Sequence, residues 1–205
     1  TLGEDFYRQT IQPNPTHRGQ AGRILNYQAQ RQVLGTAVAL GCSGPVMVIA
    51  NACASGANAI GHAWHLVRSG QHTRVLTGGY DALSQLVFAG FDSLQALSPT
   101  ECRPFDAARD GLALGEGASV LALESLASAR DRGAEILGEI VGYGACTDIH
   151  HLTQPHPEGD AAYASMREAC AVAGISPSRV GYLNAHGTGT PLNDAAEAAA
   201  INRWA

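Results

Sequence analysis

Short apolar runs alternate along the chain with segments in which apolar residues recur every three or four positions. Val46–Ala50 is apolar and rich in β-branched residues, which predicts a buried strand. The residues that follow predict a helix that ends near Ser69-Gly70, because four apolar side chains share one helical face: Ile60, Ala63, Trp64 and Val67.

The same alternation continues to the end of the chain. Short apolar runs predict further strands over 75–77, 119–123, 136–143 and the run that begins at Val180 and ends at His186. Helical spacing predicts a helix over 124–132 closed by Gly133, a helix capped by Asp160 and ended by Gly174, and a terminal helix that begins near Asp194. Strands and helices in alternation predict an α/β fold.

Cys53 lies where the first of these strands gives way to a helix, among alanine, serine and glycine. The unpaired backbone N–H groups and the positive end of the dipole at a helix start favour thiolate over thiol. This position therefore suits a nucleophile. The alternative is a small buried residue that fills a strand-to-helix corner, since free cysteine is among the most buried residue types.

His186 ends a predicted strand and is followed by Gly-Thr-Gly-Thr, a segment whose backbone and hydroxyl groups can contact a ligand. A histidine alone is more often structural. A cysteine and a histidine far apart in the sequence are, however, the expected layout of a thiol-based acyl-transfer site.

Composition narrows the partners of the chain. The 205 residues have a formal net charge of −5 and no basic runs, which argues against nucleic acid or an anionic membrane as the main partner. No apolar run is long enough to span a bilayer. Five cysteines without a C-x-x-C pair argue against a disulfide framework or a zinc cluster. We expect no metal, no cofactor and a cytoplasmic location.

Three segments together carry a family resemblance: the stretch around Cys53, the stretch around His186, and Cys102–Gly111 continuing through Gly115–Ala118. Shorter matches lie at Gly78–Ala82, Gly90-Phe91 and His151-Leu152-Thr153. From Leu40 to Trp204 the chain resembles the β-ketoacyl-acyl-carrier-protein synthases, the condensing enzymes of fatty-acid and polyketide synthesis. The segment before Leu40 matches poorly.

The resemblance implies a thiolase-like fold, in which two similar α/β halves form αβαβα layers, and an enzyme that works as a homodimer or as a paired ketosynthase. Residues 1–125 would be the latter part of the N-terminal half with the nucleophile. Residues 126–205 would begin the C-terminal half with its first catalytic histidine. A chain that starts with Thr1 and stops inside a helical pattern is expected to be a piece of a longer protein.

The resemblance also implies roles. Cys53 would accept an acyl group from an acyl carrier protein, and His186 would assist loss of carbon dioxide from the malonyl group whose carbanion then attacks the acyl thioester. Thr188 and Thr190 would bind the phosphopantetheine arm, and Glu197 would pair with a lysine. Alternatively, the hydroxyls of Thr188 and Thr190 form hydrogen bonds within a tight turn, and Glu197 is a solvated residue on a helix surface.

Other loop residues are predicted to hold the site rather than to react: Asp106, Arg109, Asp110 and Glu116. The chain contains no lysine, and the family's second histidine falls outside these residues, so we expect the chain alone not to complete a condensation. Two alternatives stay open. One is a polyketide or initiating ketosynthase, and the other is a non-catalytic, chain-length-controlling partner subunit, a class that lacks the nucleophile.

Overall fold

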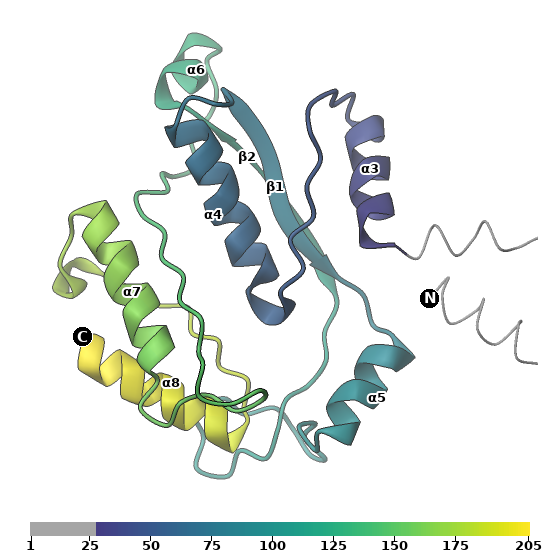
Figure 1. The fold of residues 1–205 in the computed structure, drawn as a ribbon, viewed down its shortest axis with the longest axis vertical. Coiled ribbons are helices and arrows are strands. Elements are labelled where there is room, and N and C mark those ends of the chain that lie inside the picture. The colour runs from purple at the N-terminus through teal and green to yellow at the C-terminus, as the bar shows by residue number, and fades with distance from the viewer. Residues whose placement is uncertain (1–27) are drawn as a thin grey trace, which may run out of the picture.

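The computed structural model describes residues 28–205 (Figure 1). Eight helices or strands of six or more residues and two short 3-10 turns make up this part of the chain. In order they are α3 (Ala29–Ala39), η2 (Ala52–Ala54), α4 (Ser55–Arg68), β1 (Arg74–Asp81), α5 (Gln85–Ser93), β2 (Gly117–Glu124), α6 (Leu126–Asp131), α7 (Asp160–Ala173), η3 (Pro177–Arg179) and α8 (Pro191–Trp204).

The two strands form one antiparallel ribbon, in which Arg74 lies opposite Glu124 and Asp81 opposite Gly117. Helix α4 packs along this ribbon (Figure 1). Its approach is close because glycines meet at the contact: a Cβ added at Gly79 of β1 would lie 3.4 Å from the Cα of Gly56 in α4. The absence of side chains there brings the start of α4, and with it Cys53, down onto the sheet.

Helices α7 and α8 pack against each other, away from the ribbon (Figure 1). The contact is made by small side chains, with Ala196 and Ala200 of α8 only 3% and 0% exposed. Gly159 precedes α7 with φ +62°, and a Cβ there would lie 2.2 Å from the carbonyl oxygen of Ala196. Arg203 of α8 closes the contact with an ion pair of 2.7 Å to Asp160.

Several predicted elements are confirmed, with shifted ends. The runs at 75–77 and 119–123 are β1 and β2, and Gly174 ends α7 in the left-handed conformation. The predicted cap is wrong by one position, because Gly159 is the N-cap and Asp160 is the first helical residue. The terminal helix begins at Pro191, where the fixed φ and missing N–H of proline suit the first helical position.

Three predicted strands are wrong: 46–50, 136–143 and the run that begins at Val180. Each runs without strand pairing in the described part of the chain. Val46–Ala50 is also not buried, since three of its five residues are exposed. Apolar residues indicate that a segment can be buried. A strand forms only when a second strand accepts and donates its backbone hydrogen bonds, and the local sequence does not specify that second strand.

The α7–α8 contact can be tested with two glycine-to-alanine variants. Gly159 and Gly174 have nearly the same left-handed φ, but a Cβ at Gly174 would meet nothing within 4 Å. Gly174→Ala should therefore lower the free energy of unfolding by about 1 kcal/mol, from backbone strain alone. Gly159→Ala should lower it by roughly 1–3 kcal/mol more, because the new Cβ meets a helix backbone. Urea unfolding of both variants measures the difference, and equal losses would contradict the close packing.

Candidate active site

Cys53 lies in a tight turn that Ser55 holds. Ala52 has φ +59°, a left-handed conformation that costs a non-glycine residue about 1 kcal/mol or more. The Ser55 hydroxyl accepts a hydrogen bond of 2.8 Å from the backbone N–H of Asn51 and donates one of 2.6 Å to the carbonyl of Ala52. Cys53 follows in a single 3-10 turn, and α4 begins at Ser55. The expected position at a helix start is confirmed.

His186 reaches Cys53 from the segment that precedes α8, so the structure brings together the two residues singled out by the sequence. Hydrogen bonding to His186 lowers the pKa of the Cys53 thiol, although partial desolvation opposes this shift. The same bond raises the pKa of His186, again against partial desolvation. Both shifts favour a thiolate beside an imidazolium, and the thiolate is the nucleophilic form of cysteine.

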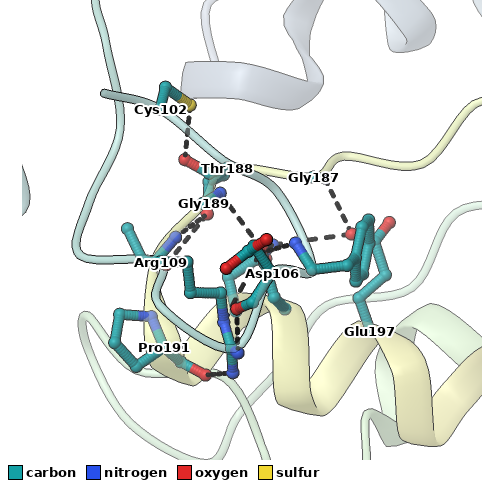
Figure 2. Close-up of polar contacts among 12 residues, drawn as sticks. Cys102, Asp106, Arg109, Gly187, Thr188, Gly189, Pro191 and Glu197 are labelled. Carbon is teal, nitrogen blue, oxygen red and sulfur yellow. Dashed lines mark hydrogen bonds and ion pairs between the residues drawn. The ribbon is translucent and has the colours of Figure 1, made fainter. Parts of the chain in front are cut away.

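Glu197 of α8 holds the backbone that carries His186. One carboxylate oxygen accepts a hydrogen bond of 2.6 Å from the N–H of His186. The other accepts one of 2.8 Å from the N–H of Gly187 (Figure 2). This half-buried carboxylate is therefore not a solvated surface group. The expected lysine partner has no counterpart among the 205 residues, since the chain has no lysine. Within the described residues, Glu197 orients the His186 loop.

Thr188 and Thr190 satisfy the turn that follows His186. Their hydroxyls are hydrogen-bonded to each other at 2.8 Å, and the N–H of Thr190 donates to the Thr188 hydroxyl at 3.3 Å. The carbonyl of Thr188 accepts a contact of 3.6 Å from the Cys102 thiol (Figure 2). The turn role is thus observed, and the phosphopantetheine role stays a prediction.

Asp194 was missed by the sequence analysis and is the most buried polar side chain of the site. It is 1% exposed, accepts a hydrogen bond of 2.7 Å from the N–H of Phe105, and accepts another of 3.1 Å from the N–H of Gly189. Arg109 lies 3.6 Å away and also donates to the carbonyl of Pro191 at 3.1 Å (Figure 2). An acidic residue in a first helical turn is common, so this position carried no special signal.

The loop-holding roles predicted for Arg109 and its neighbours are confirmed. Asp110 accepts hydrogen bonds from the hydroxyls of Ser98 and Thr100 at 2.5 and 2.7 Å, and these bonds lower the pKa of its carboxyl. The backbone N–H of Leu83 donates to Glu116 at 3.2 Å. Asp106 accepts from the N–H of Ala108. These contacts keep the 98–116 segment folded beside the turn that follows His186.

Comparison with known families identifies this arrangement. The profile of the N-terminal domain of β-ketoacyl synthases matches residues 7–129, and that of the C-terminal domain matches residues 137–205. The chain belongs to the β-ketoacyl synthase family. The match begins well before Leu40, so the resemblance extends further toward the N-terminus than expected. Residues 7–27 lie outside the described part of the chain.

Individual relatives agree with this assignment. The chain is 47% identical over 168 residues to a 3-oxoacyl-[acyl-carrier-protein] synthase 2 of Staphylococcus aureus, a match that covers 79% of this chain and 42% of the relative. It therefore spans about two fifths of the length of that relative.

Two solved structures share the fold. The ishigamide ketosynthase/chain length factor superposes with a TM-score of 0.90 at 35% identity, over 98% of this chain and 50% of that one. The AntDE:AntF complex, a type II polyketide synthase acyl carrier protein with its ketosynthase bound to the hexaketide, gives 0.85 at 34% identity, over 89% and 47%. The expected thiolase-like α/β class is confirmed by this likeness, while the division of the chain at residue 125 stays a prediction.

The described residues 28–205 contain no group of three or more side chains suited to a metal ion. They also contain no helix long and apolar enough to cross a membrane.

Reactivity should single out Cys53 among the five thiols. Cys42 and Cys146 are exposed as well, so access alone does not favour Cys53. Because its pKa is lowered, its thiolate should persist to lower pH than that of an ordinary exposed cysteine, and alkylation should slow only as pH falls through that lowered pKa. Labelling with substoichiometric iodoacetamide, followed by peptide mass mapping across pH, measures this.

His186→Ala is the matching variant. Without its hydrogen-bond partner the pKa of Cys53 should rise, and the alkylation curve should move to higher pH. Faster labelling of another cysteine in the parent protein, or an unchanged curve in the variant, would contradict the assignment.

The buried carboxylate of Asp194 should matter for stability. In Asp194→Asn the amide can accept from only one of the two backbone donors, and Arg109 loses its opposite charge. We expect the free energy of unfolding to fall by roughly 3 kcal/mol in urea titrations. Asp106→Asn is the control, because Asp106 is exposed and should cost less than about 1 kcal/mol. Equal effects of the two variants would refute the role of Asp194.

Proposed function

We propose that the protein is a β-ketoacyl-acyl-carrier-protein synthase of the discrete elongating kind, which extends an acyl chain by decarboxylative condensation with a malonyl group. The observation that carries this proposal is the hydrogen-bonded pair of Cys53 and His186, in which the thiol has a lowered pKa. The 47% identity to a synthase of the same named activity supports it.

The first step is acyl transfer to Cys53. The thiolate attacks the carbonyl of the acyl-carrier thioester and forms a new C–S bond. The C–S bond to the carrier breaks, and the carrier sulfur takes the proton of the His186 imidazolium and leaves as a thiol. The lowered pKa of Cys53 raises the fraction of thiolate at a given pH, which favours this attack. Covalent capture divides one difficult condensation into two easier reactions.

Acylation changes the state of His186. Its pKa is raised chiefly by the hydrogen bond with Cys53 and further by the charge of that residue. A thioester sulfur carries no charge, so both causes weaken once Cys53 is acylated, and the imidazole returns toward its neutral form. A neutral imidazole retains one N–H, and Glu197 holds its backbone in place.

The second step uses that N–H. Cleavage of the bond between the malonyl carboxylate and its α-carbon releases carbon dioxide and leaves the electron pair as an enolate, whose oxygen the imidazole N–H stabilises. The carbanion then attacks the Cys53 thioester carbonyl. A C–C bond forms, the C–S bond breaks and the thiolate is regenerated.

Thr188 and Thr190 are proposed to bind the phosphopantetheine arm. One hydroxyl donates to the other in the pair at 2.8 Å, which leaves the second hydroxyl hydrogen free for a ligand. The turn that carries them directly follows His186. An arm bound there would therefore arrive beside the reacting pair.

The acyl carrier protein is the proposed partner, because the relative from Staphylococcus aureus is named for that substrate and a similar solved ketosynthase is held in complex with its carrier protein. A second ketosynthase-like chain, identical or paired, is proposed as well, since another similar structure is a ketosynthase with its chain length factor. The odd number of cysteines without paired spacing supports a reducing compartment, and we place the protein in the cytoplasm.

His186→Ala separates the two half-reactions in the protein expressed from its full gene. Loss of the imidazole N–H should reduce release of carbon dioxide from malonyl carrier protein by roughly 100-fold, whereas acyl transfer to Cys53, followed by intact mass at saturating acyl donor, should still go to completion. Cys53→Ser should lose acyl transfer and serves as the control. If His186→Ala impaired both half-reactions equally, the histidine would be only a structural support.

A further inference from the structure

The segment 140–145 runs between α4 and α7 (Figure 1). Its alternate residues face opposite helices. A Cβ added at Gly142 would lie 2.3 Å from the carbonyl oxygen of Ala169 in α7, and one at Gly144 would lie 2.2 Å from that of Ser165. The two glycines therefore press this backbone directly against α7.

Tyr143, between the two glycines, faces α4 instead. Its ring lies on Gly61, where an added Cβ would come within 2.3 Å of the ring carbons. Its hydroxyl donates a hydrogen bond of 2.7 Å to the side-chain carbonyl of Asn58. The indole N–H of Trp64, on the same helix, donates to the carbonyl of Ile140 at 2.8 Å. One extended segment is thus hydrogen-bonded to α4 at two places and packed against α7.

These contacts join the two sides of the active site. Cys53 sits at the start of α4, five residues before Asn58. On the other side α7 packs on α8, and α8 carries Glu197, which holds the backbone of His186. The start of α4 and the His186 loop are therefore both positioned relative to the backbone on which Tyr143 sits.

We propose that Tyr143 is a positioning residue: its hydrogen bond to Asn58 fixes α4 so that the Cys53 thiol stays within hydrogen-bond reach of His186. The proposal rests on the proposed function only in taking Cys53 as the nucleophile. Tyr143 touches neither reacting atom. It acts by limiting how far the first turns of α4 can shift away from the His186 loop.

The test is Tyr143→Phe in the protein expressed from its full gene, which removes one oxygen and keeps the ring on Gly61. A looser α4 weakens the hydrogen bond that stabilises the thiolate. In the pH range where the parent thiol is only partly ionised, alkylation of Cys53 by iodoacetamide should therefore slow by about threefold to tenfold, and its pH profile should move to higher pH. This is the size expected for one lost hydrogen bond. A profile equal to that of the parent protein would overturn the proposal.

Tyr182→Phe is the matched control. The side chain of Tyr182 is 80% exposed, and its hydroxyl bonds only to the neighbouring Asn184 among the described contacts. It should leave the Cys53 profile unchanged, whereas equal slowing by both variants would show a general effect of losing a tyrosine hydroxyl. Circular dichroism establishes that each variant is folded.

Asn58→Ala approaches the same bond from the other side and replaces Tyr143→Phe if that variant does not fold. If Tyr143 and Asn58 act only through their shared hydrogen bond, Cys53 in the double variant should be alkylated no more slowly than in the slower single variant. If the two single effects on the alkylation rate multiply in the double variant, the proposal is overturned. Iodoacetamide needs no carrier protein, so this result is independent of the proposed condensation. Loss of acyl transfer with a normal alkylation profile would count against the proposed function and leave the role of Tyr143 intact.

Discussion

The buried carboxylate of Asp194 is the constraint on which the rest of the site depends. It lies at the start of α8 and accepts hydrogen bonds from the backbone of two loops that are distant in the sequence, at Phe105 and at Gly189. Phe105 has φ +63° and Gly189 has φ +77°, so both donors belong to left-handed turns that need support from outside. An unpaired carboxylate at this depth would be strongly unfavourable. The loops must therefore close on it together or not at all.

Asp194 and Glu197 lie three residues apart on one face of α8, and each binds a different loop. The first ties α8 to the loop around Phe105, and the second ties it to the backbone of His186. The side-chain amide of Asn193 contacts both carboxylates, at 3.2 and 3.5 Å. Because Glu197 accepts from backbone donors, it holds the backbone of His186 and leaves the side-chain nitrogens of the imidazole to other partners.

The Cys53 thiol is positioned by different contacts. Backbone strain at Ala52 is offset by the Ser55 hydroxyl, which bonds to both sides of the turn. The start of α4 and the side chain of His186 both act on the Cys53 thiol, and both favour its thiolate form. Asp81, at the end of β1, raises the pKa of Cys53 and works against them, so His186 is the stronger influence. A site that depends on one hydrogen bond is sensitive to small displacements, which is why the support from Tyr143 matters.

Much of the site could be predicted from the sequence, because its signals are local. A cysteine just before a helix, a histidine before Gly-Thr-Gly-Thr and a glycine at the end of α7 follow from short-range chemistry, and the helix start after Cys53 and the end of α7 at Gly174 lie where the pattern placed them. The contacts of Asp194, Glu197 and Tyr143 could not be predicted in this way, since their partners lie in other parts of the fold or on the backbone. The apolar runs at 46–50, at 136–143 and from Val180 were wrongly predicted as strands for a similar reason. A strand requires a hydrogen-bonded partner strand, which a local pattern does not specify. The sequence by itself determined which residues are candidates to react and where helices α4, α6, α7 and α8 lie, with ends that the structure shifts by a few positions. Only the tertiary structure decided which backbone donors the buried carboxylate of Asp194 and the half-buried carboxylate of Glu197 would satisfy, because hydrogen bonds between separate segments depend on how the whole chain packs.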